Sequence, residues 1–250
     1  MGYWETVKPT FIENWEPALY SLSMAHVDVP LSLEEAEALG GNIVELYELF
    51  PEPHIRDISE IVRRLDEATD KFPKGCFVRL GSRSPKDSFV GMKRGFKVQN
   101  GREAIELLTG ISERMSDDLL LALKEKYPPH IFVREWVDIP EWSEFRCFMD
   151  KRRLVGISQY NYLQGAVYPE IEALHDQIEW AIKMFFDTQF KPACSLPSVI
   201  FDVSVTCKGD SLERMWAVKL IEINPFFEHT DPCLFYGHKG FDGSFKFARK

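Results

Sequence analysis

Closely spaced cysteines are missing from this chain. Its cysteines are odd in number and widely separated, and no CxxC pair occurs: Cys76, Cys147, Cys194, Cys207 and Cys233. This pattern argues against a zinc site and against a disulfide framework. Most of these cysteines stand among apolar residues typical of strands, so we expect small buried side chains in a reducing cytosol.

Long apolar runs and an excess of positive charge are also absent. No stretch is apolar for long enough to predict a transmembrane helix, and the first residues lack the apolar core of a signal peptide. Lys and Arg number 30 against 39 Asp and Glu, a net charge of −9, which argues against general nucleic-acid binding. We therefore expect a cytoplasmic globular protein that binds neither nucleic acids in general nor membranes.

Familiar nucleotide and hydrolase motifs are missing as well. The chain contains neither GxxxxGK[ST] nor a GxGxxG after a strand-like segment, so neither a P-loop nor a Rossmann site is supported. It shows no Ser-His-Asp or Cys-His arrangement. Its 250 residues suffice for one large domain or two smaller ones with a sizeable core.

What the chain does offer is a set of acids inside two apolar segments, VIFDVSVT and WAVKLIEINPF. If the residues around 208–215 form a turn, the segments pair as an antiparallel hairpin. Folding about Ser211–Leu212 then brings Asp202 close to Glu222. Because side chains alternate along a strand, Glu222 and Asn224 share one face.

These oxygen donors would converge on one spot, and magnesium favours carboxylates completed by water and phosphate oxygens. The residues Asp202, Glu222 and Asn224 are therefore our candidate metal ligands. The alternative remains that Asp202 faces water on an edge strand and that Glu222-Ile-Asn-Pro is an ordinary strand end.

Arginines placed inside strand-like segments are the next feature. Arg79 stands in FVRL, Arg134 in FVREW and Arg146 in EFRCF, and Lys86 follows in the loop SRSPKDS. Guanidinium groups on sheet faces need anionic partners, and a polyphosphate is one such partner. The structural alternative is a salt bridge to a nearby acid such as Glu144 or Asp87.

The order of elements predicts an α+β fold. We expect helices over Ser32–Phe50, 56–71 and 168–190, and two more within 101–126 that break near Thr109-Gly110. Strands are expected at GCFVRLGS and IFVREWVDI, with a hairpin formed by EFRCFM and RLVGISQYNYL. Helices mixed with antiparallel hairpins favour α+β, or α/β in a loose sense.

The sequence resembles the cell division cycle protein 123 family, a divergent branch of the ATP-grasp fold. The resemblance lies in RLGSRSPKDS (79–88), VREWVDIPEWSEFRCFM (133–149), LVGISQYNYL (154–163), FDVSV (201–205) and LIEINPFFEHTDPCLF (220–235). These pieces occur in the family's order and cover most of the chain.

The resemblance implies two lobes, over residues 1–132 and 133–250, with mixed or antiparallel sheets and an ATP site between them. It implies that Asp202, Glu222 and Asn224 bind Mg²⁺. Arg79, which stands where the family has lysine, and Arg146 would act on the phosphates. The same resemblance implies further cofactor-binding residues, namely Ser82, Ser84, Lys86 and Arg134 at the phosphates and Glu135, Trp136 and Val137 at an interlobe hinge that holds adenine. Core packing is the alternative for Trp136.

Two functions follow from this resemblance, and whether the protein is an enzyme stays open. One is an ATP-dependent ligase that acts on a carboxylate of a protein or peptide. The other is an assembly chaperone for a translational GTPase, of the type that eukaryotic members serve with the gamma subunit of initiation factor 2. The chain lacks the acidic insertion of eukaryotic members at about Leu49–Asp57, and this absence favours the ligase.

Overall fold

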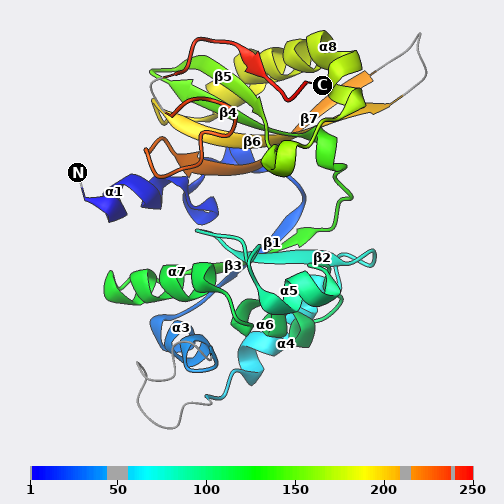
Figure 1. Cartoon of the computed structure of the whole chain (residues 1–250). Coiled ribbons are helices and arrows are strands. Elements are labelled where there is room, and N and C mark those ends of the chain that lie inside the picture. The colour runs from blue at the N-terminus through cyan, green and yellow to red at the C-terminus, as the bar shows by residue number, and fades with distance from the viewer. Residues whose placement is uncertain (1, 44–55, 209–214, 238–239, 250) are drawn as a thin grey trace. The chain divides into compact units, whose positions relative to one another are not determined.

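The computed structural model describes residues 2–43, 56–208, 215–237 and 240–249 (Figure 1). The chain packs into two compact units, one formed by Ala25–Val137 and the other by Met1–Met24 together with Asp138–Lys250. The lobes expected over 1–132 and 133–250 stay a prediction. The N-terminal residues join the second of these units through Leu22 and Ser23: the Leu220 N–H donates to the Leu22 carbonyl, and the Ser23 hydroxyl donates to the Leu220 carbonyl, both at 2.8 Å.

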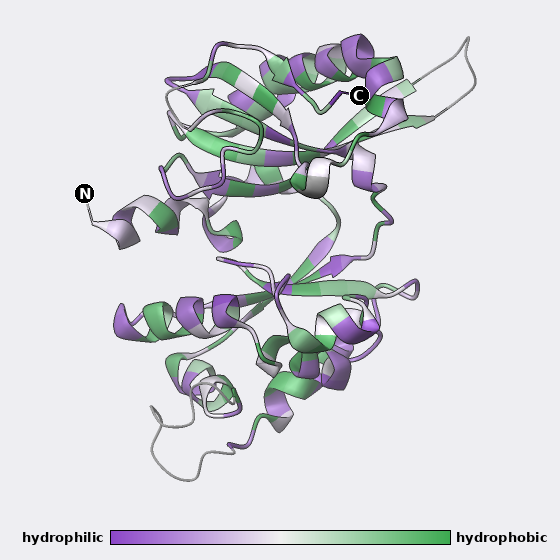
Figure 2. Ribbon diagram, viewed as in Figure 1, coloured by the Kyte–Doolittle hydropathy of each residue, from purple (hydrophilic) through white to green (hydrophobic). Residues whose placement is uncertain are grey.

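The unit formed by Ala25–Val137 contains a small antiparallel sheet. Its strands are β1 (His26–Pro30), β2 (Cys76–Leu80) and β3 (His130–Glu135), in the order β1-β3-β2. Its helices are α3 (Leu33–Gly40), α4 (Ser59–Thr69), α5 (Phe89–Arg94), α6 (Gly101–Thr109) and α7 (Glu113–Lys124). Buried residues of one sheet face, such as Val78 and Val133, pack with Ile61, Leu65 and Leu107 of the helices. Hydrophobic and hydrophilic residues alternate along α7, as an amphipathic helix requires (Figure 2).

Polar side chains cap the starts of α3, α5, α6 and α7. Ser32 and Glu35 form a capping box on α3, as the sequence predicted. The expected break between two helices within 101–126 is confirmed, because α6 ends at Thr109 and Ser112 caps α7. Helix α3 ends at Gly40, earlier than expected, since a Gly-Gly pair is a poor helix former. Residues 44–50 of the expected helix lie outside the described residues.

The other unit is built on a larger sheet with the strand order β7-β6-β4-β5-β8. The strands are β4 (Glu144–Asp150), β5 (Arg153–Gln159), β6 (Val199–Lys208), β7 (Met215–Pro225) and β8 (Phe245–Lys246). All neighbours are antiparallel except β5 and β8, which are parallel, so the sheet is mixed. The expected hairpins, β4 with β5 and β6 with β7, are confirmed, although residues 209–214 of the second turn lie outside the described residues.

One face of this sheet is covered by α8 (Pro169–Phe185), which continues into a π-helical turn (Phe186–Phe190). The ring of Phe190 stacks on Phe201 of β6 with a centroid distance of 4.0 Å. Shorter helical elements complete the unit: α1 (Tyr3–Val7), α2 (Pro17–Ser21), α9 (Lys191–Ala193) and single turns at Lys8–Thr10, Ile12–Asn14, Glu141–Ser143 and Leu163–Gly165. The α+β class is confirmed.

None of the helices in the described ranges is both long enough and apolar enough to cross a membrane.

Candidate functional site

A row of polar side chains crosses the larger sheet. Ser158 of β5 lies opposite Arg146 of β4, Arg146 opposite Asp202 of β6, and Asp202 opposite Glu222 of β7. Directly opposite residues project from the same face of a sheet, and this is the face that α8 does not cover. The four side chains are 0–9% exposed. The sheet therefore buries two acids and one arginine side by side, which requires charge pairing.

The central contact of this row is a bidentate ion pair. Arg146 Nε donates to Asp202 Oδ1 at 2.8 Å, and Arg146 Nη2 donates to Asp202 Oδ2 at 2.7 Å. Burial alone would lower the pKa of Arg146, but the attraction of Asp202 outweighs it, so the pKa of Arg146 is raised well above its usual range. Arg146 is therefore charged, and its pairing with Asp202 offsets part of the cost of burying the two groups.

Arg146 is held from further directions. Its Nη1 donates to the Asp231 carbonyl at 3.1 Å, and its guanidinium lies over the Tyr160 ring at 4.9 Å. The Tyr162 hydroxyl donates to the Asp231 carboxylate at 3.0 Å. Burial and this carboxylate raise the pKa of Tyr162 to about 12. The tyrosines after β5 and the segment after β7 thus fix the arginine in one position.

The expected metal ligands lie together at one end of the row. Asn224 Nδ2 lies 3.4 Å from Asp202 Oδ2 and 3.4 Å from Glu222 Oε1. The predicted pairing of Asp202 with Glu222 is confirmed. Asp202 is fully buried rather than exposed on an edge, because β6 lies between β4 and β7.

This donor set fits Mg²⁺ in its chemistry. Two carboxylates and one amide supply hard oxygen atoms. Asp202 accepts one bond from Arg146 at each carboxylate oxygen, and Asn224 Nδ2 also lies 3.4 Å from its Oδ2. Asn224 directs its nitrogen at the carboxylates, so it would have to turn its amide to present Oδ1 to a cation. Within the described ranges no three or more His, Cys, Asp or Glu side chains gather to hold a metal; the expected site has only two carboxylates, and its role stays a prediction.

The other unit carries the remaining expected residues. Arg79 lies opposite Phe132, and Arg134 opposite Phe77, so both arginines project from the sheet face that points away from the helices. They are 4% and 5% exposed. Arg79 Nε donates to the Leu80 carbonyl at 3.0 Å. Two buried guanidinium groups therefore occupy diagonal positions on one face.

The loop after β2 contains the residues expected to cover phosphates. Ser84 is buried, whereas Ser82 and Lys86 are half-buried. The neighbouring Arg83 pairs with Asp118, with Nε 3.1 Å from Oδ1. We considered Asp87 as an acid that could form a salt bridge with one of the arginines. Its carboxylate accepts from the Ser112 hydroxyl at 2.6 Å. This loop is therefore tied to the start of α7.

The expected adenine-binding residues lie where the chain passes from one unit to the other, directly before Asp138. The Glu135 N–H donates to the Ala25 carbonyl at 2.8 Å, and the Trp136 N–H donates to the Gly75 carbonyl at 3.0 Å. Lys97 Nζ lies over the Trp136 ring at 5.8 Å. The backbone N–H groups of Glu135 and Trp136 thus donate to neighbouring segments of the same unit. The third N–H group of this segment is that of Val137.

Sequence reasoning missed the residues that surround Arg146. Tyr160 and Tyr162 stand two positions apart after β5, and Asp231 stands in the segment TDPC. Ser158 accepts from the Leu234 N–H at 3.2 Å. The alternation in SQYNYL indicates that every second side chain lies on the same face. Which residues those side chains contact depends on the order of the strands in the sheet.

A family model described as D123 matches residues 44–239 of this chain. The "Translation initiation factor eIF2 assembly protein" of Xenopus tropicalis is 26% identical over 187 residues, which cover 72% of this chain and 53% of that protein. The protein of the same name from Sclerotinia sclerotiorum is 28% identical over 190 residues, covering 71% and 44%. The chain thus spans about half the length of the curated relatives it matches.

The fold is also similar to a solved structure, that of Cdc123 from Schizosaccharomyces pombe. The TM-score is 0.73 at 21% sequence identity, and the match covers 92% of this chain and 89% of that one. At this identity the likeness shows a shared fold.

Proposed function

Because the chain belongs to the D123 family, we propose that it binds ATP together with Mg²⁺ and assists the assembly of translation initiation factor 2. The observation that carries the nucleotide part is the row of Arg146, Asp202 and Glu222, with Asn224 at its end. The burial of Glu222 beside this ion pair, within 3.4 Å of the Asn224 amide, supports the proposal, because carboxylate and amide oxygens are the ligands that Mg²⁺ prefers.

In this proposal Asp202, Glu222 and Asn224 hold the cation. When bound, Mg²⁺ would neutralise part of the negative charge of the triphosphate. The two carboxyl groups of the row, those of Asp202 and Glu222, would supply oxygen ligands to this cation. Arg146 fixes the orientation of the Asp202 carboxylate through two hydrogen bonds. Its contacts with Tyr160 and Asp231 keep the guanidinium from turning away.

The proposal assigns phosphate binding to Arg79, Arg134, Ser82, Ser84 and Lys86. The burial of both arginines supports it, because a buried guanidinium binds an anion strongly. The Val137 N–H is the proposed contact for adenine.

The names of the relatives support the second part of the proposal, in which initiation factor 2 is the partner. We take its gamma subunit as the partner chain. Ligation of a carboxylate stays a prediction from the resemblance to ATP-grasp enzymes. The partner experiment described below distinguishes the ligase function from the assembly function.

Isothermal titration with ATP, with and without Mg²⁺, tests nucleotide binding. We expect tight binding that needs Mg²⁺, and a loss of at least about tenfold in Glu222→Gln, since a carboxylate ligand is replaced by a neutral amide. The exposed acid Asp187 gives a matched control, Asp187→Asn, which should bind like the wild type. Equal affinities with and without Mg²⁺ would overturn the metal assignment.

The partner is tested by adding purified gamma subunit of initiation factor 2 to the protein with Mg-ATP. We expect a stable complex that Glu222→Gln weakens. If instead ATP turnover rises with an added peptide or amino acid and mass spectrometry detects an adduct, the ligase function replaces the assembly function.

A further inference from the structure

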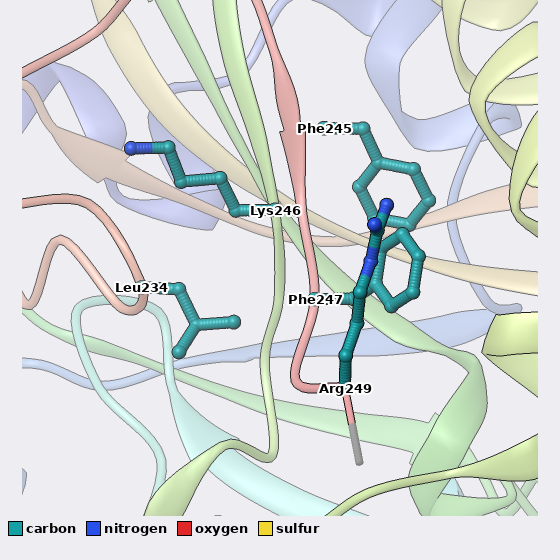
Figure 3. A pocket seen from close by; sticks show the side chains of 5 residues that line it. All are labelled: Leu234, Phe245, Lys246, Phe247 and Arg249. Atoms are coloured by element: carbon teal, nitrogen blue, oxygen red, sulfur yellow. The ribbon is translucent and has the colours of Figure 1, made fainter.

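The outer edge of the larger sheet carries a feature that the nucleotide site does not use. Strand β8 is the last strand at this edge among the described residues. A groove of about 350 Å³ runs along it, lined by Leu234, Phe245, Lys246, Phe247 and Arg249 (Figure 3). Four of these residues are near neighbours in the chain, so the groove follows the strand rather than one sheet face.

In the described part of the chain, β8 pairs with a strand on one side only, that of β5. The Ile157 N–H donates to the Ser244 carbonyl at 3.1 Å, and the Ala248 N–H donates to Gln159 Oε1 at 3.1 Å. The even-numbered residues therefore turn their backbone groups toward β5. By alternation, Phe245 turns its N–H and C=O away from the sheet. Outward backbone groups at a sheet edge can pair with another strand.

Two positively charged side chains, Lys246 and Arg249, lie along this edge. The Lys246 ammonium lies over the Phe235 ring at 4.3 Å, and the Arg249 guanidinium lies over the Phe247 ring at 4.8 Å. Within the described part of the chain neither forms an ion pair. Asp242 lies near enough to interact with Lys246, but its carboxylate accepts from the Ser244 N–H and hydroxyl. Two cations at one edge are notable in a chain with a net charge of −9.

The same edge has apolar surface to bury. Leu234, Phe245 and Phe247 are half-buried, which leaves part of each side chain accessible. Figure 3 shows Phe245, Phe247 and Arg249 on one side of the strand, with Leu234 and Lys246 on the other. An occupant must therefore present apolar and acidic groups to both sides.

We propose that this edge binds an extended, acidic segment of a partner protein as an added strand. Alternate side chains of a strand point to opposite sides, so acids three positions apart would meet Lys246 on one side and Arg249 on the other. The two residues between them would place apolar groups near Phe247 and near Leu234. Pairing of backbone groups supplies affinity, and the side chains supply selectivity. This inference is independent of the proposed ATP site.

The probe for this proposal is a fluorescein-labelled peptide that contains Glu-Phe-Leu-Glu, measured by fluorescence polarisation on the full chain. Three comparison peptides are needed: one with lysines in place of the glutamates, one N-methylated at alternate backbone nitrogens in one register, and one methylated in the other. We expect one methylated peptide to lose about tenfold or more in affinity and the other to bind normally, because only one register faces β8.

The protein variants are Lys246→Gln and Arg249→Gln. Each should weaken binding about threefold, as expected for a half-exposed ion pair. Arg102→Gln is the matched control, since Arg102 lies on α6 in the other unit with 87% of its side chain exposed. All variants should keep a Tm close to that of the wild type, because the Arg102–Glu106 pair is exposed and the contacts of Lys246 and Arg249 with aromatic rings contribute little to stability.

Three results would overturn the proposal: no binding of the acidic peptide, equal affinity of both methylated peptides, or affinities that neither Lys246→Gln nor Arg249→Gln changes. Dimerisation of the chain that the peptide blocks would also overturn it, since a second copy would then occupy the edge.

Discussion

The ion pair between Arg146 and Asp202 makes a quantitative prediction about stability. Arg146→Met and Asp202→Leu each remove one partner and leave the other charge buried. The pair is 0–6% exposed, so solvent screens it little. Removing one member of such a pair costs about 3–5 kcal/mol. The double variant buries an apolar pair instead, and its free energy of unfolding should lie within about 2 kcal/mol of the wild type.

Urea unfolding followed by tryptophan fluorescence measures these differences. Five of the six tryptophans belong to the unit that holds the pair: Trp4, Trp15, Trp142, Trp180 and Trp216. The double-mutant cycle should therefore give a coupling energy of several kcal/mol between Arg146 and Asp202. If the double variant instead loses the sum of the two single losses, the two side chains do not stabilise one another and our description of the row is wrong.

Three further predictions concern other parts of the molecule. Iodoacetamide at about pH 8 should modify Cys207 first in the native protein, because Cys207 is half-exposed. Burial raises the pKa of Cys76 and Cys194 to about 11 and that of Cys233 to about 12, so these thiols react more slowly. Peptide mapping that finds Cys233 modified first would contradict this prediction. Burial also raises the pKa of Asp118 above 3.8, more than Arg83 lowers it, so the folded state holds this proton more tightly and stability should fall as pH rises from about 4. The fall should be smaller in Asp118→Asn, and identical pH profiles would contradict it. Gly156→Ala should cost about 1–3 kcal/mol in urea unfolding, since a Cβ there would lie 2.6 Å from Phe235 Cζ, and an unchanged midpoint would show that the ring moves freely.

The local part of the site could be predicted from the sequence. Strand alternation and a symmetric turn were enough to pair Asp202 with Glu222, and the structure confirms this pairing. The same reasoning placed Asn224 on the face of Glu222. These relations are short-range, and the two-residue period of a strand fixes them.

The neighbours of Asp202 on its other side could not be predicted in this way. Arg146 is 56 positions away in the chain, and its contact with Asp202 depends on β4 lying beside β6. We expected Arg146 to meet phosphates; the structure shows that it donates two hydrogen bonds to Asp202. The contacts of Tyr160 and Asp231 with Arg146 depend on the same strand order.

The ends of two helices were also not predicted correctly from the sequence. The capping box of Ser32 and Glu35 gave the start of α3, but its expected end at Phe50 ignored Gly40 and Gly41, where the helix stops. The helix expected over 168–190 is present, but its last turn widens into a π-helix at Phe186–Phe190. There Phe186 and Phe190 are buried against Phe201, so packing with a distant strand sets the geometry of this turn.

We propose that Asp202, Glu222 and Asn224 bind the cation that accompanies ATP. A crystal grown with Mn²⁺ and a non-hydrolysable ATP analogue, with anomalous scattering recorded for manganese, tests it most directly. We predict an anomalous peak at about 2.1 Å from oxygens of Asp202 and Glu222, with the Asn224 amide turned to present Oδ1. An anomalous peak elsewhere, with the analogue bound and these three side chains pointing apart, would contradict the claim.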